Sequence, residues 1–212
     1  MANTKALVTS YDLHPSVAYV QTVLANLRTK TGHTAEAWVE LIRGQGLADP
    51  KAIQGWLKTQ GLGGTHAGLL TQRASTAPGH AFDDTPQGYL AAAPGYVDGQ
   101  YGGKKAALRP LFEQIVTRIR GLGPDVKVCP CETIVPFYRN HVFAEVKPLV
   151  ARLDLGVALG DPAKVKDPGG RLKDTGGFAK KDRITHKMEI TSEADIEFAL
   201  PWLRRAYERD KG

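Results

Sequence analysis

Basic residues and glycines recur together in one stretch of the sequence, from Gly160 to Lys187. Glycine pairs at 169–170 and 176–177 would let backbone N–H groups approach an anion, while lysine and arginine attract phosphate over longer distances. The pattern therefore predicts a binding site for nucleic acid or another anion. Together with residues of the neighbouring segments, the predicted binding residues are Arg139, Arg152, Lys166, Arg171, Lys173, Lys180, Lys181, Arg183 and His186.

Two other interpretations of these residues stay open. A solvated loop without a ligand has the same composition, and four aspartates in the stretch partly cancel its charge. Arg152 and Asp154 stand at alternate positions and would share one face of a strand. They form either a structural ion pair or, with Arg139 and His186, part of the lining of a pocket.

The distribution of charge favours an anionic partner. The chain has 212 residues, a formal net charge of +6 and a pI near 9.3. Residues 1–103 carry seven basic and seven acidic residues, so the whole excess falls in residues 104–212, which carry 21 basic and 15 acidic residues. Such an asymmetry indicates attraction to polyanions and does not bear on the fold. A basic surface without any partner would produce it as well.

Cys129 and Cys131 flank Pro130 and would place two thiols on the same face of a strand. Zinc needs four ligands, and this C-x-C pattern beside His141 has no recognised zinc spacing. A redox motif would need C-x-x-C at a helix start, which the sequence lacks. We therefore expect two structural thiols and no metal site.

The stretch Gly61-Leu62-Gly63-Gly64-Thr65-His66 leads into a helical pattern and could hold phosphate at the start of that helix. No strand pattern precedes it and no lysine follows its glycines, so it is neither a dinucleotide-binding nor a P-loop motif. We interpret it as a turn between two helices. The sequence also has no nucleophile-elbow, zinc-protease or paired-carboxylate motif, so it predicts no enzyme activity and no cofactor.

The patterns in residues 104–212 predict an α+β fold, in which an antiparallel sheet lies between two helices in sequence. This fold must position the basic residues. Between Asn140 and Leu159, apolar and polar residues alternate on both sides of Lys147-Pro148, which predicts two strands joined by a turn there. Helical patterns at Lys104–Gly121 and Ser192–Arg209 would cover the apolar face of the sheet. About five strands are expected, the others at 126–128, 133–138 and 184–190.

The first 74 residues predict a helical domain. His14-Pro15, Thr34, Asp49-Pro50 and Thr65 are typical helix starts, and each precedes apolar residues at helical spacing, so four short helices are expected. Residues 75–103 are rich in proline and glycine and predict an irregular but ordered linker, docked on a domain through aromatic side chains. Those aromatic residues are Phe82, Tyr89, Tyr96 and Tyr101.

Two sets of residues resemble known families. Thr31-Gly32-His33-Thr34 with Trp38, followed by 61–67, resembles a small helical domain of unknown function found in bacterial proteins. The second set resembles an uncharacterised domain that often accompanies it and is sometimes labelled a predicted transport protein; its residues are 104–110, 152–156, 170–172 and 202–207. This second part is also similar in topology to bacterial sheet-and-helix domains of the MmcQ/YjbR kind, some of which are suspected of binding DNA. The resemblance covers most of the chain outside the linker and implies no catalytic residues.

These observations lead to two hypotheses. The first is a cytoplasmic, non-enzymatic protein whose basic domain binds a polyanion such as nucleic acid. The alternative is an enzyme or sensor for a small anionic ligand, held between sheet and linker by Arg139, Arg152, Arg171 and His186, with Tyr96 or Tyr101 as a lid. We expect the cytoplasm and no membrane partner, because the sequence has two cysteines, no signal-peptide pattern and no apolar run near the roughly 20 residues that span a bilayer.

Overall fold

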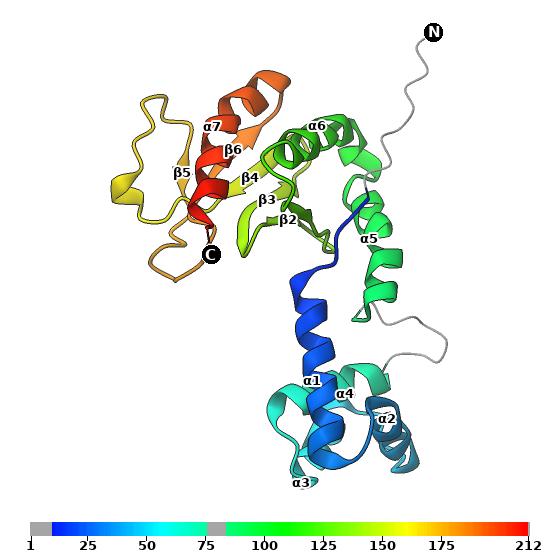
Figure 1. Ribbon diagram of the computed structural model, residues 1–212. Helices are drawn as coiled ribbons and strands as arrows, with labels where there is room; N and C mark the ends of the chain where they lie inside the picture. Colours follow the sequence, from blue (N-terminus) through cyan, green and yellow to red (C-terminus); the bar gives the residue numbers. More distant parts are fainter. Residues whose placement is uncertain (1–9, 76–83, 212) are drawn as a thin grey trace. The chain divides into compact units, whose positions relative to one another are not determined.

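The computed structural model describes residues 10–75 and 84–211, which form two compact units (Figure 1). The helical unit lies within His14–Tyr89, and the sheet unit comprises residues 10–13 and 90–211. The chain is α+β, as the sequence predicted. Phe82, one of the aromatic residues predicted to dock the linker, lies outside the described residues.

Four helices build the core of the helical unit: α1 (Pro15–Thr31), α2 (Ala35–Gly44), α3 (Pro50–Thr59) and α4 (Gly64–Ser75). The predicted caps of α2 and α3 are confirmed, because the side chains of Thr34 and Asp49 each accept a hydrogen bond from the backbone N–H three residues on, at 3.2 and 2.8 Å. The glycine-rich stretch joins α3 to α4, as predicted, but α4 begins at Gly64, so Thr65 lies inside its first turn. The buried apolar residues of this unit include Leu27, Ile42, Ile53, Leu57 and Leu70.

Helix α5 (Pro86–Gln100) occupies most of the described part of the segment predicted to be an irregular linker. That prediction was wrong because it treated each proline as a break. Pro86 stands at the first helical position, where its missing N–H leaves no bond unmade, and Pro94 is accommodated inside the helix. Tyr101, just beyond the helix, is buried and stacks on Phe112 with 4.8 Å between ring centroids. It belongs to the core of the sheet unit, so it does not form a lid.

Six strands form one antiparallel sheet in the order β1-β2-β3-β4-β6-β5. They are β1 (Lys127–Val128), β2 (Val135–Tyr138), β3 (Val142–Pro148), β4 (Leu153–Val157), β5 (Lys173–Asp174) and β6 (His186–Ile190). The predicted alternation is confirmed in the central pair, where Ala144, Val146 and Leu155 are buried. The turn predicted at Lys147-Pro148 lies further on, where Leu149 N donates to Arg152 O at 2.9 Å, because Pro148 still pairs with Leu153.

Two helices pack against the sheet (Figure 1). They are α6 (Arg109–Arg120), preceded by the short 3₁₀ helix Gly103–Leu108, and α7 (Glu193–Arg209). Phe112 and Ile115 of α6 and Leu203 of α7 share one hydrophobic core with the buried residues of the strands. The end of α7 is thereby fixed beside the residues that precede β3 and β6, where the candidate site lies.

Candidate anion-binding site

Most of the predicted binding residues have carboxylate partners within the fold. Surface ion pairs contribute little to stability, but each one reduces the positive potential that a cation offers to a ligand. Arg171 pairs with Asp195, and the other pairs join Arg139 to Asp125 at 2.6 Å, Arg152 to Asp154 at 2.9 Å, Lys173 to Glu189 at 2.8 Å and Arg183 to Asp210 at 2.6 Å.

Arg139 and Arg171 hold the ends of α7 against the sheet unit. The guanidinium of Arg139 lies 4.4 Å from the ring centroid of Tyr207, near the end of the helix. The guanidinium of Arg171 lies 4.2 Å from the ring centroid of Phe198 and pairs with Asp195 near its start. Burial alone would raise the pKa of Asp195, but hydrogen bonds from Thr191, Ser192 and Arg171 hold it well below its ordinary value. Both arginines therefore have a structural role.

His186 is buried in the sheet unit. Its side chain in β6 is buried, with 3% of the residue exposed, and its Nδ1 lies 2.9 Å from Thr185 Oγ1. Burial lowers the pKa of this imidazole, so it is neutral near neutral pH. The pocket predicted to join His186 with Arg139, Arg152 and Arg171 is not formed, because each of these arginines contacts a different part of the sheet unit.

The three remaining predicted residues, Lys166, Lys180 and Lys181, are exposed and make no ion pair with any described residue. Lys180 and Lys181 belong to a tight turn, in which Gly177 O accepts hydrogen bonds from Lys180 N at 3.0 Å and from Asp182 N at 2.9 Å. Lys181 has φ 61°, which is unusual for a residue with a side chain. The turn thus holds Lys181 in a defined position, unlike a freely solvated loop.

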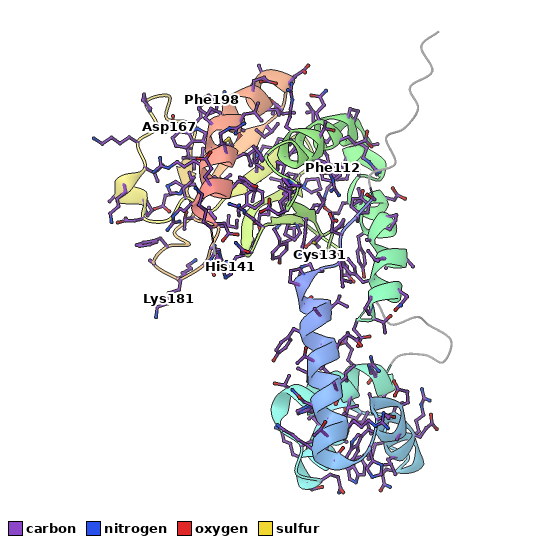
Figure 2. All side chains as sticks on the ribbon, in the orientation of Figure 1. Phe112, Cys131, His141, Asp167, Lys181 and Phe198 are labelled. Atoms are coloured by element: carbon purple, nitrogen blue, oxygen red, sulfur yellow. The ribbon has the colours of Figure 1, made fainter. Side chains whose placement is uncertain are left out.

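A pocket of about 650 Å³ lies between this turn and the end of α7, and we call it the basic pocket. Figure 2 labels His141 and Lys181, two of its lining residues, near the C-terminal end of α7. Its basic lining residues are His141, Lys181, Arg183, Arg209 and Lys211, and its acidic ones are Asp182 and Asp210. The sequence prediction had found Lys181 and Arg183 but missed Arg209 and Lys211, and it had considered His141 only as a zinc ligand.

Asp210 organises one wall of the basic pocket. Only 4% of the residue is exposed, and its carboxylate accepts hydrogen bonds from His141 N at 2.7 Å and from Arg183 Nη2 at 2.6 Å. His141 Nδ1 lies 3.0 Å from the same carboxylate, which leaves Nε2 as the free nitrogen of the ring. A buried charge of this kind needs several partners, and here they are the guanidinium of Arg183 and the backbone N–H and ring of His141.

Arg209 also lines the basic pocket and has no carboxylate partner among the described residues. Its guanidinium lies against the backbone of Gly160, close enough that a β-carbon there would stand 2.5 Å from the guanidinium atoms. Gly160 has φ 82°, and the N–H groups of Leu159 and Gly160 donate to Thr185 Oγ1 at 3.2 and 3.0 Å. The positive φ favours glycine at this position, and a side chain there would displace the guanidinium of Arg209.

The two cysteines lie outside the basic pocket. Cys129 is buried, with Sγ 3.7 Å from Leu13 O, and burial raises the pKa of its thiol to about 12. Burial also raises the pKa of Cys131, which is partly exposed. Neither thiol has the lowered pKa of a reactive cysteine. Residues 10–75 and 84–211 contain no cluster of histidine, cysteine and carboxylate side chains that could hold a metal ion.

Comparisons with known proteins agree with the resemblance seen in the sequence. Residues 97–210 match the family model Domain of unknown function (DUF5655), and residues 20–75 match Domain of unknown function (DUF4287). No curated protein and no solved structure matches the chain. Within the described residues, no helix has the length and apolar character needed to cross a membrane. The predicted pair of domains is confirmed: the chain belongs to the DUF5655 family and carries a DUF4287 domain ahead of it.

Proposed function

We propose that the sheet unit binds a phosphate-bearing ligand in the basic pocket. The observation that carries this proposal is the position of Lys181, Arg209 and Lys211, which line one pocket and pair with no carboxylate of the described residues. Most other cations of the predicted site are already engaged in ion pairs. Unpaired cations in a concave site produce a stronger local potential than the same charges on a convex surface.

The dimensions of the pocket favour a small ligand. A volume of about 650 Å³ falls within the range of small-molecule sites. The two acidic side chains that line the pocket differ in how much negative charge they present to an anionic ligand. Asp210 is compensated by Arg183 and by the backbone of His141, whereas Asp182 is exposed. The charge that remains around the pocket is positive, as binding of a phosphate group requires.

Binding of nucleic acid is the second candidate function. It is favoured by the confinement of the net charge to residues 104–212 and by Lys166 and Lys180, which are exposed and unpaired but do not line the basic pocket. A strand that crossed the pocket could contact these lysines with neighbouring phosphates, and its affinity would fall steeply with salt. Both candidates are binding functions.

Isothermal titration at about 50 mM salt tests the proposal, with inorganic pyrophosphate and a single-stranded DNA of about 20 nucleotides as probes. We expect Arg209→Gln to weaken pyrophosphate binding by about tenfold or more, because a hydrogen bond to a charged group is lost. Arg204→Gln is the matched control: this exposed arginine of α7 lies outside the pocket, and we expect its removal to change the affinity by less than about twofold. If neither probe binds the wild-type protein, the proposal is wrong.

A further inference from the structure

We propose that the ligand of the basic pocket carries an aromatic base beside its phosphate, so that the site takes a nucleotide unit. The proposal rests on the proposed function and adds the class of ligand. It starts from Phe178, which lines the pocket and is 49% exposed. Exposure of a phenylalanine ring to water is unfavourable, because burial would stabilise the fold. An exposed apolar side chain at a pocket therefore suggests a contact with a ligand.

The fold presents this ring instead of burying it. Phe178 follows Gly177, whose backbone approaches Ile184 O so closely that a side chain at this position would collide with it. Lys181 N donates to Phe178 O at 3.1 Å, and Gly177 N donates to Thr175 Oγ1 at 3.1 Å, so the residues on both sides of the ring are fixed. None of the ring pairs or cation–π contacts of the described residues involves Phe178. Its face is therefore available to a ligand.

The same turn presents Phe178 and Lys181 to the pocket that Arg209 also lines. A phosphate bound by Lys181 and Arg209 would leave the attached base to stack on Phe178. Stacking of one base on an aromatic side chain raises affinity by about five- to 100-fold and tolerates different bases, since every base has a π-face. A free nucleotide and one nucleotide of a single strand both offer this combination of base and phosphate.

The test compares AMP with ribose 5-phosphate, which has the same phosphate but no base. We expect AMP to bind wild-type protein about fivefold tighter or more. Phe178→Leu should remove this preference and leave the affinity for ribose 5-phosphate within about twofold of wild type. Val150→Ala, at an exposed apolar residue of the sheet unit outside the pocket, should leave the preference for AMP intact.

Each outcome decides one statement. Equal affinities for AMP and ribose 5-phosphate, or binding of pyrophosphate but of neither of them, would overturn the nucleotide inference while the proposed function stands. No binding of AMP, ribose 5-phosphate, pyrophosphate or DNA would refute the proposed function itself. A single strand of about six deoxyadenylates distinguishes the sources. This comparison applies once AMP is shown to bind more tightly than ribose 5-phosphate through Phe178. If the strand then binds about tenfold more tightly than AMP, the site is assigned to a strand; if the two affinities are equal, it is assigned to a free nucleotide.

Discussion

Substitution of Gly160 by alanine separates the binding role of Arg209 from the stability of the fold. Two effects act at this position. The backbone has φ 82°, where a residue with a β-carbon costs about 1 kcal/mol of folding free energy. In addition, the new β-carbon would stand 2.5 Å from the guanidinium of Arg209, which must move away. Because the guanidinium is the free end of a flexible side chain, its displacement adds little to the loss of stability but removes a cation from the pocket.

Gly170→Ala is the matched control. Gly170 has φ 62°, a similar backbone conformation, and a β-carbon there meets no atom within 4 Å. Both variants should therefore lose about 1 kcal/mol in urea unfolding and agree with each other within about 0.5 kcal/mol. Only Gly160→Ala should weaken pyrophosphate binding, by about tenfold, which is the effect expected of Arg209→Gln. Equal affinities of the two glycine variants would refute the assignment of Arg209 to the site.

Three further predictions concern stability and reactivity. Asp210→Asn should lower the free energy of unfolding by about 2 kcal/mol, because Arg183 and His141 lose a buried charged acceptor, whereas Asp182→Asn in the same pocket should change it by less than about 0.5 kcal/mol in urea titrations. The folded-state pKa of Asp195 is lowered, so its carboxylate stabilises the fold above about pH 4 and this stability is lost as the pH falls; Asp195→Asn should flatten that part of the stability profile. Cys129, with a pKa raised to about 12, should react with iodoacetamide near pH 8 at least about tenfold slower in the native protein than in urea, as measured by mass spectrometry.

Local patterns in the sequence predicted most of the architecture. The alternation around Ala144 and Leu155 and the N-caps at Thr34 and Asp49 depend on neighbouring residues, and each is found as expected. The linker is the exception. Helix α5 contains Pro94, which is unfavourable inside a helix. Nothing in the sequence of this segment shows that the stabilisation from burying Val97 would exceed that cost.

The candidate site was harder to predict, because its residues meet only after folding. Lys181 and Arg183 precede β6, His141 precedes β3, and residues 209–211 lie at the end of α7 and just beyond it, so no sequence window contains them together. One local signal was available. The glycine at position 160 directly follows a predicted strand and marks a turn, but the sequence does not reveal that an arginine about 50 residues later lies against it.

The ion pairs explain why net charge alone does not identify the residues that would bind an anion. Each lysine or arginine counts equally in the formal net charge of +6, whether or not it is paired with a carboxylate. A paired one, however, presents a much weaker positive electrostatic potential to a ligand. Arg139 and Arg171 illustrate this, since each combines a carboxylate with an aromatic ring and fixes one end of α7. By holding that helix in place they position Arg209 and Lys211, so in the proposed site these two arginines would act through residues that the sequence prediction missed.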